Sequence, residues 1–211
     1  HGDMEGRGTS RSADVMATVK TPMDEWKTIH WKKVERIVFK LQKRIYRASE
    51  QNDRKKVHRL QRLMTKSYAG RLLAVRKVTQ DNQGKKTAGV DGQKSLTSKQ
   101  RTNLSKTLCV DGNASPLRRV EIPKPGTTEK RELGIPTLSD RAKQTLVKLA
   151  LEPEWEARFE ANSYGFRPGR SCHDAIEAIF NAISRQAKWC LDADVAKCFD
   201  RIAHEPLLEK V

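Results

Sequence analysis

Acidic residues near the end of the sequence are the first candidates for chemistry. The stretch LDADVAKCFDRI at residues 191–202 places Asp192 and Asp194 two positions apart, ahead of an aromatic residue and a third aspartate. On a β-strand, alternate side chains point to the same face, so these two carboxylates would lie together. Carboxylate oxygens at a strand end can hold a hard divalent cation. Acidic pairs at strand ends also serve as helix caps or solvated turn residues, and the pattern alone leaves that alternative open.

The elements that must position these carboxylates can be predicted from local patterns. The residues AKWCLDAD indicate a short strand at 187–194, after a helix over about 172–187 and before a helix that starts in HEPLLEKV, where Pro206 fits the first turn. Alternation of apolar and charged residues around the turn PGTT predicts a β-hairpin within 117–136. Ser139 is the predicted N-cap of a helix over roughly 140–152, which Pro153 ends or bends.

Two basic amphipathic helices are predicted earlier in the chain, at 30–48 and 54–77, as a helical hairpin around SEQND. Apolar residues recur in both at helical spacing, which indicates faces packed in a core. Residues 32–77 hold sixteen Lys and Arg against three Asp and Glu. The opposite faces are therefore candidates for phosphate contact, since each such contact releases counterions. The cations that we expect to bind nucleic acid here are Lys40, Arg44, Arg59 and Arg62.

The net charge of +16 is unevenly distributed. Residues 1–119 contain 28 basic and 11 acidic residues, whereas residues 120–211 contain 14 and 15. The whole excess lies in the first part, which favours a polyanionic partner such as nucleic acid over a merely soluble basic surface. No run of residues is long and apolar enough for a membrane span, and we expect no membrane partner.

Four segments occur in an order that resembles one known family. They are TAGVDG (87–92), IPKPGTTEKRELGIPTLSDRAKQ (122–144), NSYGFRPGRS (162–171) and LDADVAKCFDRIAH (191–204). Together they closely resemble the reverse transcriptases of bacterial and organellar group II introns, which are the intron-encoded maturases. The resemblance covers about residues 26–211. It implies an α+β fold: mostly helical fingers with a short antiparallel β-hairpin, and the first strand of a right-hand polymerase palm.

The resemblance gives the acidic segment specific roles. Asp194 matches the first catalytic aspartate of the palm, which binds two Mg²⁺ ions, and the backbone carbonyl of Val195 would be a further metal ligand. Asp192 would then support the metal ligands or be structural, and would not be a direct ligand. Phe199 matches the ring under the nucleotide sugar that excludes a 2′-hydroxyl, although a core aromatic beside the strand is the alternative.

The same resemblance assigns cations of the fingers. Lys124 and Arg131 match residues that grip the triphosphate of an incoming dNTP, a role that suits guanidinium and ammonium groups. Alternatively, both are ordinary exposed charges of the hairpin. Arg141, Arg167 and Arg170 match residues that contact the template or order the fingers, and YGFRPGR could equally be a rigid loop.

Two functions follow from the resemblance. In the first, the chain is the N-terminal part of an RNA-directed DNA polymerase with intron RNA, RNA template with DNA primer, and dNTP as partners. In the second, it is a non-catalytic RNA-binding module that assists intron splicing. The Tyr-x-Asp-Asp motif that supplies the family's remaining metal ligands does not occur in these residues. We therefore expect no polymerisation by these residues alone, and interpret them as a piece of a longer protein or a truncated reading frame.

We expect four regions along the chain. Residues 1–25 form a disordered tail or cloning remnant, 26–80 the basic helical extension, 81–187 the fingers, and 188–211 the start of a truncated palm. An unpaired strand edge and apolar surface in such a palm would favour a homodimer. The four cysteines form no CxxC pair and no signal peptide opens the chain, which is typical of a cytoplasmic bacterial protein or an organellar matrix protein rather than a secreted one.

Overall fold

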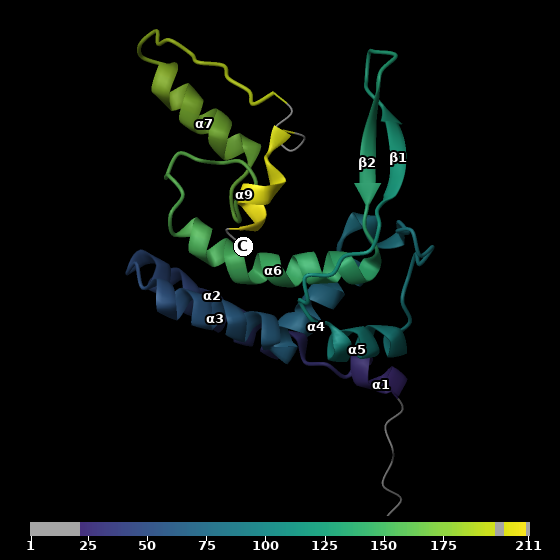
Figure 1. The fold of residues 1–211 in the computed structure, drawn as a ribbon. Coiled ribbons are helices and arrows are strands. Elements are labelled where there is room, and N and C mark those ends of the chain that lie inside the picture. Colours follow the sequence, from purple (N-terminus) through teal and green to yellow (C-terminus); the bar gives the residue numbers. More distant parts are fainter. Residues whose placement is uncertain (1–21, 197–200, 210–211) are drawn as a thin grey trace, which may run out of the picture. The chain divides into compact units, whose positions relative to one another are not determined.

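The computed structural model describes residues 22–196 and 201–209, and the side chains from Glu25 onward. The chain divides into two compact units, one up to Phe159 and one from Glu160 on. The first unit contains packed helices from which one β-hairpin projects (Figure 1). Its elements are α1 (Pro22–Lys27), α2 (Trp31–Glu50), α3 (Arg54–Lys66), α4 (Tyr68–Arg76), the π-turn η1 (Lys77–Asp81), the 3₁₀ turn η2 (Gln83–Lys86), α5 (Ser98–Thr107), β1 (Arg118–Pro123), β2 (Lys130–Ile135) and α6 (Leu138–Glu156).

Helix α6 is the element around which the first unit packs. It contacts α2, α3 and α4, and Figure 1 shows it lying across them. Val38, Ile45 and Leu60 are among the fully buried side chains between these helices. A second cluster joins α6 to α4 and α1 through Leu146, Val75 and Trp26. Most residues of the predicted apolar faces of the first two basic helices are therefore core, although Ile37 is 45% exposed, and their cations face outward.

The predicted second helix, 54–77, is two helices in the structure. Ser67 has extended backbone angles, and its hydroxyl accepts a hydrogen bond from the amide of Gly70. It therefore ends α3 and caps α4. Leu63 and Tyr68, which one continuous helix over 54–77 was expected to place on its apolar side, are about half exposed.

The start and end of α6 also differ from the prediction. Thr137, not Ser139, is its N-cap, since the Thr137 hydroxyl accepts from the amide of Asp140 at 3.1 Å. Pro153 lies inside the helix instead of ending it. A proline cannot donate to the carbonyl four residues earlier. Here the side-chain amide of Gln42 donates to that carbonyl of Leu149 at 3.2 Å, so α2 supplies the missing hydrogen bond.

The β-hairpin is confirmed. β1 and β2 are antiparallel, with Val120 opposite Leu133 and Ile122 opposite Arg131. The turn contains Gly126 at a φ of +75°, a backbone conformation that glycine adopts without steric cost. The hairpin extends away from the helices of its unit, as Figure 1 shows.

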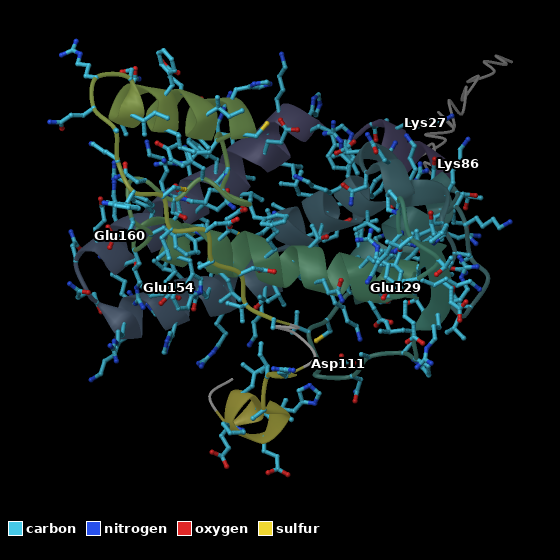
Figure 2. The ribbon with its side chains drawn as sticks, turned by 90° about the horizontal axis from the view of Figure 1, so that it is seen from above. Lys27, Lys86, Asp111, Glu129, Glu154 and Glu160 are labelled. Carbon is cyan, nitrogen blue, oxygen red and sulfur yellow. The ribbon has the colours of Figure 1, made fainter. Side chains whose placement is uncertain are left out.

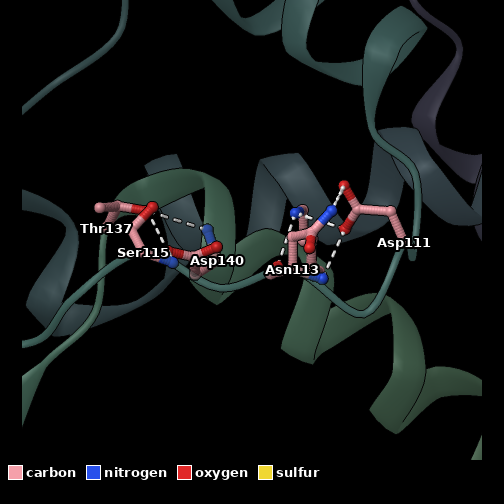
Figure 3. A network of polar contacts seen from close by, with 6 residues as sticks. Asp111, Asn113, Ser115, Thr137 and Asp140 are labelled. Atoms are coloured by element: carbon pink, nitrogen blue, oxygen red, sulfur yellow. Dashed lines mark hydrogen bonds and ion pairs between the residues drawn. The ribbon is translucent and has the colours of Figure 1, made fainter.

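A polar network ties the loop before β1 to the first turns of α6 (Figure 3). The Asp111 carboxylate accepts hydrogen bonds from Lys143 at 2.8 Å and from Asn113. The Lys143 ammonium, followed by the amide groups of Asn113, lowers the pKa of Asp111 to about 2. Beside it, Asp140 accepts from the backbone amide of Ser115 at 3.1 Å.

The lowered pKa of Asp111 predicts how the stability of the fold responds to acid. A carboxyl whose pKa is lower in the folded chain stabilises the fold above its unfolded pKa of about 3.9 and loses that effect as the pH falls through about 2. Urea unfolding of the native chain and of Asp111→Asn should therefore give midpoints that differ above about pH 4 and converge toward pH 2. A difference that stays constant over this range would contradict the assignment.

The second unit contains two helices in its described part, α7 (Cys172–Ile183) and α9 (His204–Leu208). Ser171 caps α7 in a reciprocal arrangement with Asp174. The strand predicted at 187–194 is not formed. A strand needs a hydrogen-bonded neighbour, and in the described residues β1 and β2 pair only with each other.

Candidate functional site

Two cations predicted to bind nucleotide lie on the same face of the hairpin. Because Ile122 is opposite Arg131 and the Lys124 amide donates to the Glu129 carbonyl, Lys124 and Arg131 are on one side of the two strands. On the other side, Arg119 pairs with Glu132 and Lys130 with Glu121. One face of the hairpin therefore carries two ion pairs, and the other face carries the two cations that are predicted to bind nucleotide.

The ammonium of Lys124 is not free on this face. It lies 2.6 Å from the Glu129 carboxylate across the turn, and Figure 2 places Glu129 on the hairpin. The hydrogen bond and the charge of Lys124 hold the pKa of Glu129 below its ordinary value. Arg131, by contrast, has no ion pair with any residue the structure describes. The Glu129 carboxylate therefore neutralises one of the two cations that are predicted to bind the triphosphate.

Two guanidinium groups, one from the start of β1 and one from the first turn of α6, hold the backbone of residues 84–88. Arg141 donates to the carbonyls of Gly84, at 2.8 Å, and of Thr87. Arg118 donates to the carbonyl of Ala88 at 2.9 Å. Burial lowers the pKa of Arg141 from its ordinary value, against the charge of Asp91. These contacts support the loop-ordering alternative for Arg141, and its contact with template stays a prediction.

A basic groove lies between α2 and α3. It has a volume of about 300 Å³, and the side chains that line it are Arg44, Arg59, Leu60, Arg62, Leu63 and Lys66. Three of the four cations predicted on these helices are therefore brought together, and Lys66 joins them. Lys40 is one helical turn before Arg44 but is not part of the lining. No carboxylate lines this groove, which we call the α2–α3 groove.

In the second unit, the predicted arginines hold backbone in place. Arg167 is buried and donates to the carbonyls of Glu160 and Ser163, at 2.6 and 2.8 Å. Arg170 donates to the carbonyl of Ala161 at 2.6 Å and stacks on the ring of Tyr164. Both contacts give the 162–171 segment a fixed shape, which supports the rigid-loop alternative for YGFRPGR.

The predicted metal ligands Asp194 and Val195 lie on an exposed segment of the same unit, and Asp192 beside them is also exposed. Among residues 22–196 and 201–209, no cluster of three or more His, Cys, Asp or Glu forms a metal site. A carboxylate and a carbonyl are oxygen donors that suit Mg²⁺, but they supply only part of an octahedral shell. Phe199 lies outside the described residues.

Comparison with known proteins identifies the class to which this chain belongs. Residues 26–108 match the N-terminal domain of reverse transcriptase, and residues 122–211 match the reverse transcriptase (RNA-dependent DNA polymerase) domain. The chain therefore belongs to the reverse transcriptase family, and the family and the α+β fold expected from the sequence are confirmed. In the described part of the chain, none of the helices has the length and apolar character to cross a membrane.

Within that family, the chain resembles proteins of group II introns. It is 36% identical over 164 residues to Maturase-like protein 1 of Euglena gracilis, covering 73% of this chain and 34% of the relative. It is 42% identical over 93 residues to the Group II intron-encoded protein LtrA of Lactococcus lactis subsp. cremoris, which is 44% of this chain and 15% of that protein. It is also 32% identical over 185 residues to Protein YkfC of Escherichia coli (strain K12), which is 83% of this chain. The chain spans 48% of the length of YkfC.

Several residues at these sites were not predicted from the sequence. Glu129 follows the predicted turn PGTT and was given no role, although a hairpin closed by that turn could have placed it opposite Lys124. Lys66 follows Arg62 by four residues, so helical spacing alone could have added it to the basic groove. No pattern in the sequence indicates the role of Arg118, because its hydrogen-bond acceptor is a backbone carbonyl in a loop thirty residues earlier.

Proposed function

We propose that the chain is the N-terminal part of an RNA-directed DNA polymerase of a group II intron, and that it holds intron RNA in the α2–α3 groove. The observation that carries this proposal is the groove itself, where three guanidinium groups and one ammonium group line one concavity without a carboxylate. Such a surface favours phosphates, because every contact releases condensed counterions. The match of this region to the N-terminal domain of reverse transcriptase supports it.

The hairpin is proposed to bind the triphosphate of an incoming dNTP. Arg131 offers a planar, bidentate donor to phosphate oxygens, and Lys124 a compact charge. Glu129 must release Lys124 when the nucleotide binds, which a triphosphate with several negative charges can bring about at an exposed ion pair. Phe199 would discriminate against a 2′-hydroxyl at this nucleotide.

Asp194 and the carbonyl of Val195 are proposed to hold Mg²⁺ together with ligands from outside the described residues. When bound, Mg²⁺ stabilises developing charge on phosphoryl oxygens. This chain's own contribution is to supply and orient hard oxygen donors. Arg141, Arg167 and Arg170 are proposed to keep the loops at 84–92 and 162–171 in shape, so that these loops can face RNA template with its DNA primer.

A second candidate function is an RNA-binding module that assists splicing without catalysis. The observation that favours it is the contrast between the two sites, since the basic groove is complete within the described residues and the metal site is not. Primer extension on an RNA template with Mg²⁺ separates the candidates. We expect no extension by these 211 residues, and incorporation of dNTP would contradict our view of the metal site.

Salt dependence of RNA binding tests the groove. Arg44→Gln, Arg59→Gln and Arg62→Gln should each weaken binding of a structured RNA, and each should reduce the slope of log affinity against log salt by about 1. The matched control is Lys148→Gln on α6, whose ammonium is already paired with Glu152 at 3.3 Å. Filter binding between about 50 and 200 mM salt gives the slopes. A native affinity that does not change with salt would exclude phosphate contact as its source.

A further inference from the structure

The outward side of α2 carries two exposed aromatic rings that neither the core nor the groove uses. Phe39 is 59% exposed and Tyr46 is 37% exposed. They are seven residues apart, so they lie on the same side of the helix about two turns, or roughly 10 Å, from one another. The buried residues Val38, Leu41 and Ile45 lie on a different side, about a third of a turn around the helix. We call the exposed side the aromatic face of α2.

The aromatic face is surrounded by cations. Helical spacing places Lys43 and Arg47 beside the two rings, with Lys32 and Arg36 one or two turns earlier. The Lys43 ammonium lies 5.6 Å from the centre of the Phe39 ring, which is a cation–π contact. Within the described residues these four cations have no ion pair: Glu35 is bound to Arg76 at 3.0 Å, and Glu50, one turn after Tyr46 at the end of α2, forms no ion pair with them.

This combination fits one kind of partner. A protein interface of this size would favour contiguous apolar surface, whereas here two separate rings alternate with positive charge. Rings within a basic surface are typical of proteins that bind single-stranded nucleic acid, where bases stack on aromatic side chains and cations contact the backbone. Paired bases are already stacked inside a helix, so only unpaired nucleotides can use such rings.

We propose that the aromatic face of α2 binds an unpaired segment of RNA, with one base stacked on Phe39 and another on Tyr46. This proposal deepens the RNA-binding function proposed above and rests on it. The α2–α3 groove contacts phosphates of any RNA, whereas the aromatic face selects RNAs that present a loop or a bulge. The two surfaces share α2 and differ in what they recognise.

The test compares two RNA hairpins of equal length, one with a large unpaired loop and one almost fully paired, on the 211-residue chain. Phe39→Leu with Tyr46→Leu keeps apolar side chains but removes both rings. We expect this double variant to lose on the order of tenfold or more in affinity for the looped RNA, from the worth of base stacking on each ring. Affinity for the paired RNA and the salt slopes of both should be unchanged. Phe39→Trp, which keeps a ring, should retain binding of the looped RNA.

A second measurement uses only the native chain, so it does not depend on the folding of a variant. A 2-aminopurine base in the loop should lose fluorescence when the native chain binds, because the base stacks on a ring. Unchanged fluorescence, or equal losses of affinity for both RNAs in the double variant, would overturn the aromatic-face proposal while RNA binding itself stands. If the native chain binds neither RNA, the proposed function fails as well. A change of oligomeric state with no change in RNA affinity would mark this face as a protein contact and would also overturn the proposal.

Discussion

Asp194→Ala, made in a protein that carries the rest of the polymerase domain, is expected to abolish DNA synthesis on an RNA template while RNA affinity stays near its native value. Metal stabilisation of the reacting phosphoryl group is worth several kcal/mol. At about 1.4 kcal/mol per factor of ten, its loss lowers the rate by roughly a thousandfold or more. Single-turnover primer extension and filter binding on the same preparations measure the two quantities separately.

The neighbouring aspartate provides the matched control for this substitution. Asp192 is also an exposed aspartate, two residues away, yet it is predicted not to be a direct metal ligand. Asp192→Ala should therefore retain most of the synthesis that Asp194→Ala removes. Asp194→Asn, which keeps the side-chain shape without the charge, should be as inactive as the alanine variant. Parallel loss of synthesis and RNA binding in the Asp194 variants would show that this residue supports the fold instead of a metal.

The helical character of α2, α3 and α4 could be predicted from the sequence because apolar residues recur at helical spacing, and that of α6 from its cap and proline signals. The two exceptions show where such patterns stop being informative. A serine within a predicted helix is compatible with continuation, and only the hydrogen bond from Gly70 to Ser67 makes it the boundary between α3 and α4. Pro153 is tolerated in α6 because Gln42, far away in sequence, donates to the freed carbonyl of Leu149. Compensation over such a distance leaves no local signal.

The candidate sites also contain features that local patterns predict and features that they do not. Alternation around a turn predicted the hairpin, and the observed register then places Lys124 and Arg131 on one face. The pairing of Lys124 with Glu129 follows from the same register, because the turn at PGTT places these two residues opposite each other. The strand expected before Asp194 is not formed, because strand formation depends on a neighbouring strand as well as on the residues themselves.

Gly89→Ala is expected to lower the free energy of unfolding of the first unit by about 1–3 kcal/mol, the usual cost of forcing extra atoms into a packed site. A Cβ atom at Gly89 would lie 2.7 Å from the Thr137 Cα atom and 2.9 Å from the Pro136 carbonyl oxygen. Both neighbours are backbone, which cannot move aside as a side chain can. Urea unfolding followed by circular dichroism gives the difference from the native chain.

The same substitution should also affect the hairpin, because of where Gly89 lies. Its loop is held by Arg118 and Arg141, and the backbone it touches belongs to the N-cap of α6. A shift of the loop should therefore move the base of β1 and β2, and with it the hairpin that carries Lys124 and Arg131. Gly84→Ala is the matched control from the same segment, since its Cβ atom would meet only the Arg141 guanidinium, at 3.7 Å. If Gly89→Ala unfolds at the same urea concentration as Gly84→Ala, the close contact between this loop and the start of α6 does not exist in solution.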